Sequence, residues 1–133
     1  MIVDSSALVA ILKREPERQA FAQMLKDSAE VRISTATYFE ASIVVDSARD
    51  PITSRMLDDL IENSRIVMEP VTEEQARIAR QAYRDYGRGS GHKANLNFGD
   101  CFAYALARVK REPLLYKGDE FIHTDIRSAM KPT

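Results

Sequence analysis

Four acidic residues stand at positions where carboxylates could carry out chemistry. Asp4 ends a short apolar run, Glu40 lies on an apolar helical stripe, Asp100 begins a helix, and Asp119 follows another apolar run. If these side chains converge, they could not share a dry pocket without strongly raised pKa values or a cation. Hard oxygen ligands favour Mg²⁺ or Mn²⁺, and such ions activate water for displacement at a phosphoryl group. The candidate chemistry is therefore metal-assisted hydrolysis, which needs no His or Cys nucleophile.

Each of these acids also has a local structural interpretation. Asp4 suits a helix N-cap, although the two serines after it could fill that role. Glu40 could close a capping box with Thr37, and Asp100 could be a first-turn acid favoured by the helix dipole. Asp119 follows a glycine and suits a solvated turn. What decides between the two sets of interpretations is whether the four carboxylates meet.

Short apolar strands and helices alternate along the chain and must position these acids. The pattern predicts strands at 2–3, 31–34, 66–68 and 114–116, and helices around 7–12, around 21–25, over 36–49, from 51, over 72–86 and over 102–109. Such alternation implies a parallel sheet that is covered on both faces. Ligands of these sheets bind beyond the carboxyl ends of the strands, where Asp4 is expected.

Composition narrows the class of protein. The 133 residues predict a single domain over 1–133. A net charge of −1 excludes a protein held on nucleic acid by bulk positive charge. The single cysteine, Cys101, excludes internal disulfides and is interpreted as a small buried thiol, because no His is placed to activate it. We expect a cytoplasmic protein without a membrane segment, since no long apolar stretch or signal peptide is present.

Four stretches together resemble a known family. They are residues 2–8 (IVDSSAL), Glu40, residues 97–101 (NFGDC) and residues 114–121 (LLYKGDEF), and they occur in the family's order along the whole chain. The chain resembles a PIN domain and, more narrowly, a VapC-type ribonuclease toxin of a bacterial toxin–antitoxin pair. That resemblance implies a three-layer α/β/α sandwich with a short parallel β-sheet.

The resemblance also implies the site and its partners. Asp4 and Asp100 would hold a first Mg²⁺ ion, with Mn²⁺ able to replace it, and Glu40 would complete the site. Ser6 matches the family's hydroxyl residue and would position a water or a carboxylate. The implied reaction is cleavage of RNA by metal-activated water. The implied partners are a cognate antitoxin, whose helix fills a groove, and a second copy of the chain in a homodimer.

The fourth acid of the site stays open between three residues. Relatives often carry Asp directly before the Phe, a place that Glu120 holds here. We choose Asp119, one residue earlier, and Asp125 is a further candidate.

The approach of RNA to an acidic pocket requires positive charge at its rim. Residues 87–99 contain basic side chains and no acid, and aromatic residues flank them: Arg88, His92 and Lys93, with Tyr83, Tyr86 and Phe98. Aromatic side chains there could stack on bases, while a mobile solvated connector is the plain alternative. Two alternative functions are a non-catalytic binding module and a receiver-like domain with Asp4 as phosphoacceptor. The order of acids along the chain fits a receiver-like domain poorly.

Overall fold

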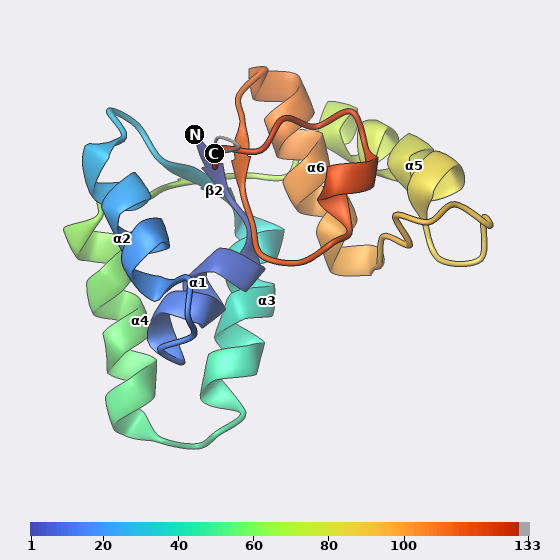
Figure 1. The fold of residues 1–133 in the computed structure, drawn as a ribbon. Helices are drawn as coiled ribbons and strands as arrows, with labels where there is room; N and C mark the ends of the chain where they lie inside the picture. The colour runs from blue at the N-terminus through green and yellow to red at the C-terminus, as the bar shows by residue number, and fades with distance from the viewer. Residues whose placement is uncertain (131–133) are drawn as a thin grey trace.

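Four short parallel strands form the centre of the chain, and helices cover both faces of their sheet (Figure 1). The structure is a computed structural model that describes residues 1–130. The strands are β1 (Ile2–Val3), β2 (Arg32–Ser34), β3 (Val67–Glu69) and β4 (Leu114–Leu115), in the order β3-β2-β1-β4. The predicted parallel sheet, and with it the α/β/α fold class, is confirmed.

Within residues 1–130, six α-helices pack around the sheet. They are α1 (Ser5–Leu12), α2 (Arg18–Asp27), α3 (Thr35–Asp46), α4 (Pro51–Asn63), α5 (Glu73–Tyr86) and α6 (Phe98–Lys110), and a 3₁₀ helix, η1 (Phe121–His123), follows β4. Figure 1 shows α1 to α4 gathered on one side and α5 and α6 on the other. The segment at 121–130 holds η1, and its Ser128 forms an isolated β-bridge with Leu114.

Alternation along the strands builds one hydrophobic core on each face of the sheet. Val3, Ile33 and Leu115 pack against α1 to α4, while Ile2 and Leu114 pack against α5 and α6. Neighbouring residues of a strand point to opposite faces, which explains this division. All five side chains are fully buried, and each such burial contributes about 1.5–3 kcal/mol. The two cores fix the carboxyl ends of β1 and β2 between the two helical layers.

The beginnings of two helices are set by N-capping side chains, and one of the two predicted starts is wrong. The helix predicted over 102–109 begins at Phe98, because Asn97 and Asp100 form a capping box that satisfies the first turn. Thr72 caps α5, accepting from the Gln75 amide at 3.1 Å, which agrees with the helix predicted over 72–86. The Gln75 side chain does not return that bond and instead donates to the carbonyl of Pro70 at 3.3 Å.

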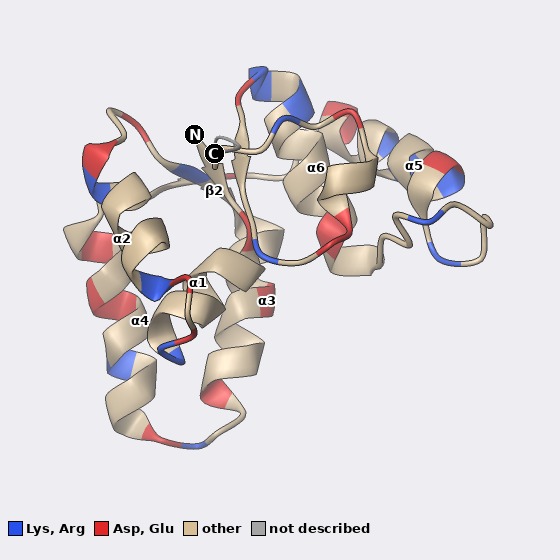
Figure 2. Cartoon of the chain, in the orientation of Figure 1, with Lys and Arg blue, Asp and Glu red and all other residues tan. Residues whose placement is uncertain are grey.

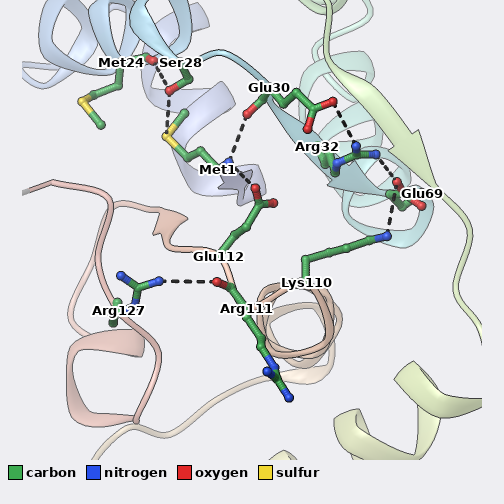
Figure 3. Close-up of polar contacts among 10 residues, drawn as sticks. All are labelled: Met1, Met24, Ser28, Glu30, Arg32, Glu69, Lys110, Arg111, Glu112 and Arg127. Atoms are coloured by element: carbon green, nitrogen blue, oxygen red, sulfur yellow. Dashed lines mark hydrogen bonds and ion pairs between the residues drawn. The ribbon is translucent and has the colours of Figure 1, made fainter.

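A network of ion pairs surrounds Glu69 near the C-terminal end of α6 (Figure 3). Arg32 donates to the Glu69 carboxylate and also pairs with Glu30 at 3.2 Å. Lys110, the last residue of α6, reaches Glu69 at 3.8 Å. Every carboxylate of this network therefore has a cationic partner.

No helix within residues 1–130 is long and apolar enough to cross a membrane. The prediction of one domain over 1–133 stays a prediction, and its last three residues lie outside the described part.

Candidate active site

Three acids from separate segments of the chain lie near the carboxyl end of β1, close enough for their charges to interact. Asp4 directly follows β1 and caps α1, Glu40 lies on α3, and Asp100 lies in the first turn of α6. The charges of Asp100 and Glu40 both raise the pKa of Asp4, and Glu40 also raises that of Asp100. In Figure 2, red segments at the end of β1, on α3, at the beginning of α6 and after β4 mark this region.

Asp4 is the most buried acid of the chain, with 2% of its surface exposed. Its Oδ2 accepts from the Ser6 amide at 3.1 Å and the Ser6 hydroxyl at 2.6 Å, so the N-cap interpretation holds. Its Oδ1 is buried without a hydrogen-bond partner among the described residues. Burial raises the pKa of Asp4 to about 7, although the bonds from Ser6 oppose the shift. An unsatisfied buried carboxylate oxygen is costly unless a proton or a cation meets it.

Ser6 connects Asp4 to the segment that follows β4. Its Oγ donates to Asp4 and accepts from the Lys117 amide at 2.9 Å. The Lys117 ammonium pairs with Glu15 and Glu17 at 3.3 Å each, which holds this segment against the end of α1. Ser6 therefore fixes one oxygen of Asp4 and leaves the other free.

Glu40 is held by two contacts that the sequence did not reveal. Because α3 begins at Thr35, Glu40 lies beyond its first turn, and the interpretation of a capping box with Thr37 is wrong. The Ser5 hydroxyl donates to Glu40 Oε1 at 2.7 Å. A methyl group at Gly99 would lie only 1.7 Å from Glu40 Oε2, so the carboxylate rests on the bare backbone of α6. The only sequence signal for Ser5 is its place beside Asp4.

Asp100 combines a capping role with a place in the site. Its Oδ2 accepts from the Asn97 amide at 3.0 Å, and its own amide donates to Asn97 Oδ1 at 2.8 Å. Burial raises the pKa of Asp100 to about 6, the charges of Glu120 and Glu40 add to the rise, and Arg88 opposes it. The local interpretation and the site interpretation are thus both compatible with the geometry.

Of the two acids after Gly118, Glu120 is the one whose charge raises the pKa of Asp100. Gly118 adopts a φ of +112°, and a methyl group there would lie 2.5 Å from Glu120 Oε2. Glu120 therefore folds back over this glycine, half-buried, and its charge raises the pKa of Asp100. Asp119 is exposed and forms no side-chain hydrogen bond or ion pair within residues 1–130.

Two other residues singled out in the sequence have structural partners. Asp125 accepts from the Tyr104 hydroxyl at 2.7 Å and pairs with Arg108. The buried Cys101 thiol donates to the Asn97 carbonyl at 3.3 Å. Burial raises the pKa of Cys101 to about 11, so it is no nucleophile at neutral pH.

The three acids fit a hard divalent cation by donor type. Each has one oxygen engaged locally, by Ser6, Ser5 or the Asn97 amide, and a second oxygen without a hydrogen bond in the described part of the chain. Within residues 1–130, no three His, Cys, Asp or Glu side chains are already close enough to hold a metal ion. The fit to a cation therefore rests on the type of donor atom and on the buried Asp4 Oδ1, an unsatisfied carboxylate oxygen of the kind that a hard cation binds.

A groove of about 680 Å³ opens beside Glu40, between α5 and the beginning of α6. Of the residues predicted to form a basic and aromatic rim, Arg88, Tyr83 and Phe98 line it. Tyr86 instead packs edge-on against His92, with ring centroids 4.9 Å apart. A role of this rim in binding RNA stays a prediction.

Comparisons with known sequences give a consistent result. The family model described as PIN domain matches residues 1–127. The chain is 57% identical over 130 residues to VapC ribonuclease Mb0625 of Mycobacterium bovis and to ribonuclease VapC28 of Mycobacterium tuberculosis, covering 98% of each chain. It is 50% identical over 129 residues to ribonuclease VapC42 of Mycobacterium tuberculosis, covering 97% of this chain and 98% of that one.

Two solved structures share the fold. One is Mycobacterium tuberculosis VapC20, a toxin that cleaves the sarcin-ricin loop, with a TM-score of 0.75, 15% identity and 98% coverage of both chains. The other is a toxin–antitoxin complex from Klebsiella pneumoniae, with a TM-score of 0.65, 15% identity, and coverage of 90% of this chain and 88% of that one.

Proposed function

The chain belongs to the PIN-domain family and, within it, to the VapC ribonucleases, and on this premise we propose that Asp4, Glu40 and Asp100 cleave RNA with a divalent metal ion. Its class is that of a ribonuclease toxin in a toxin–antitoxin pair. The observation that carries the metal proposal is the buried Asp4 Oδ1, which no described residue satisfies.

Asp4 and Asp100 would bind the ion directly, with Glu40 as a third donor. Their oxygens favour Mg²⁺, and Mn²⁺ is expected to replace it. A bound ion of this kind lowers the pKa of a water and stabilises charge at the scissile phosphate. Ser6 and Ser5 orient Asp4 and Glu40 by the hydrogen bonds already described, as donors to one oxygen of each acid. The chain thereby fixes one oxygen of each acid and leaves the other without a hydrogen bond among the described residues.

For the fourth acid, Glu120 has better support than the predicted Asp119. Its charge acts on Asp100, whereas Asp119 is exposed. We expect Glu120→Gln to lower the rate of RNA cleavage about tenfold, as loss of an outer ligand commonly does. The matched variant Asp119→Asn should change the rate less than twofold. The opposite ranking would return the role to Asp119.

Partner binding is supported by apolar side chains that the fold leaves exposed. Phe39 and Ile43 on α3 and Ile52 and Met56 on α4 are exposed, although residues of this type are normally buried. We propose that a cognate antitoxin and a second copy of this chain cover such surfaces, with RNA as the substrate. The proposed place of action is the cytoplasm, where RNA is available.

The test is incubation of the purified chain with total cellular RNA in Mg²⁺, in Mn²⁺ and in EDTA. We expect discrete fragments with either metal, none with EDTA, and a loss of about 100-fold or more in Asp4→Asn and Asp100→Asn. Asp58→Asn, an exposed acid of α4, is the matched control and should cleave normally. Circular dichroism would verify that all variants fold. Full cleavage by both site variants would refute the assigned roles, and intact RNA in every lane would favour the non-catalytic binding module.

A further inference from the structure

The groove beside Glu40 is lined by aromatic and basic side chains. It is lined by Arg80 and Tyr83 of α5, by Arg88, and by Phe98 at the first position of α6. Its volume of about 680 Å³ falls within the range of about 300–1,000 Å³ that is typical of ligand sites. Glu40 lines the same groove, so whatever binds there lies next to the three acids.

Phe98 offers an open aromatic surface to this groove. Its side chain is 78% exposed, although it stands two residues before Asp100. Phe102 supports the ring edge-on, with centroids 5.0 Å apart and planes at 83°. Tyr83 also lines the groove and is 46% exposed. Flat, exposed and supported rings are the surfaces on which unpaired bases stack.

Positive charge in the groove is unneutralised. Within residues 1–130, neither Arg80 nor Arg88 forms an ion pair with an acid, whereas Arg77, less than one turn before Arg80, pairs with Glu73 at 3.6 Å. The charge of Arg88 lowers the pKa of Asp100, so it acts on the site itself. Figure 2 shows the connection from α5 to α6 with basic residues in blue and no acidic ones. These cations complement the phosphates of a strand that enters the acidic centre.

We propose that this groove is a base-binding subsite for single-stranded RNA. An unpaired base next to the cleaved bond stacks on Phe98, and Arg80 and Arg88 contact its phosphates. The inference rests on the proposed ribonuclease function and deepens it, because it requires an unpaired base beside the scissile phosphate. A protein segment bound in the groove would be stabilised by any apolar side chain at position 98 and would not require a flat aromatic ring. Substitutions at Phe98 can therefore distinguish a bound RNA from a bound protein segment.

The experiment measures binding of a short, labelled single-stranded RNA of mixed sequence by fluorescence anisotropy, in EDTA so that no cleavage occurs. We expect Phe98→Leu and Phe98→Ala to weaken binding about tenfold, and Phe98→Tyr to bind like the parent chain. Unlabelled double-stranded RNA should compete poorly. Because the Phe98 side chain is largely exposed, these variants should fold, which unfolding curves would verify.

A second pair of variants tests the role of the arginines. Arg80→Gln should weaken binding and reduce the slope of log affinity against log salt by about one phosphate contact. Arg84→Gln, an exposed position on the same helix outside the groove, should change neither.

The outcomes separate this inference from the nuclease proposal. Metal-dependent cleavage together with unchanged RNA binding by Phe98→Leu and Phe98→Ala would overturn the subsite and leave the nuclease intact. If these variants then lose affinity for the antitoxin, the groove is a protein-docking surface. Failure of the parent chain to bind single-stranded RNA would overturn the subsite whatever the cleavage assay shows. Stacking-dependent binding without any cleavage would support the subsite and refute the nuclease.

Discussion

Carboxylates cluster in two regions of the described chain, and only one of these regions pairs them with cationic side chains. Around Glu69, each acid has a cationic partner, with Arg32 shared between Glu69 and Glu30 (Figure 3). In the candidate active site, no Lys or Arg of residues 1–130 pairs with Asp4, Glu40 or Asp100. The first region uses charge to hold structure together. The second keeps charge unpaired at a cost to the fold, which is typical of a site that awaits a ligand.

The pKa values follow this contrast. Burial and mutual repulsion raise the pKa of Asp4 to about 7 and that of Asp100 to about 6. In the paired network, the hydrogen bonds that Arg32 donates to Glu69 and Glu30 raise the pKa of Arg32, which keeps its charge. Substitutions in the two regions should therefore have opposite signs for stability, and only one region should matter for cleavage.

Apart from substitutions of the acids themselves, the largest effect is expected at Gly99, where the backbone rather than a cation keeps Glu40 in place. A methyl group there would lie 1.7 Å from Glu40 Oε2. Gly99→Ala should displace this carboxylate and lower cleavage about 100-fold, as small misplacements at active sites can do. Stability should not fall to match, because alanine favours a helix over glycine by about 1 kcal/mol. Cleavage kinetics and chemical denaturation measure the two quantities.

A double-mutant cycle controls for other effects of that substitution. In a Glu40→Gln background, Gly99→Ala should cost much less, because both changes act on one side chain. Equal losses in both backgrounds would show that Gly99 acts on something other than Glu40.

A smaller effect, on stability, is expected at Asp4. Its pKa is about 7 when folded, against about 4 in an unfolded chain. The folded state therefore binds more protons between these values, and stability falls as pH rises through them. Asp4→Asn removes this titration while keeping a good N-cap. In EDTA at about pH 8, we expect the variant to be more stable than the parent on the order of 2 kcal/mol, with little difference near pH 4.

Denaturation midpoints at both pH values provide the measurement. Mg²⁺ should then stabilise the parent chain more than Asp4→Asn, because a ligand that binds only the folded state adds to stability. A variant that is less stable than the parent at high pH would remove the contrast between the two regions.

The sequence could place Asp4 at the edge of the sheet because its position follows from local rules. Asp4 follows an apolar strand and precedes a helix, and parallel sheets collect such residues at one edge. The N-caps at Thr72 and Asn97 also depend only on near neighbours, although the helix capped by Asn97 was predicted to begin only at 102.

Contacts between distant segments could not be predicted in this way. Ser5 meets Glu40 across 35 positions of the chain, and the amide of Lys117 meets Ser6 across 111. The choice between Asp119 and Glu120 depends on the positive φ of Gly118, which turns one acid inward and leaves the other exposed. Tertiary packing determines these contacts and exposures, and a single sequence does not reveal it.

The smallest effect is expected in the paired network, and it should have the opposite sign to that at Asp4. Glu69→Gln removes one of the two carboxylate partners of Arg32 and the carboxylate that pairs with Lys110, and these pairs are partly shielded from solvent. We expect a loss of about 1 kcal/mol in the free energy of unfolding, less at high salt, and unchanged cleavage. Glu73→Gln, in an exposed pair with Arg77, is the matched control and should cost only about 0.3 kcal/mol. If Glu69→Gln instead stabilises the chain, the ion pairs around Glu69 do not contribute to stability, and the proposed difference between the two regions is wrong.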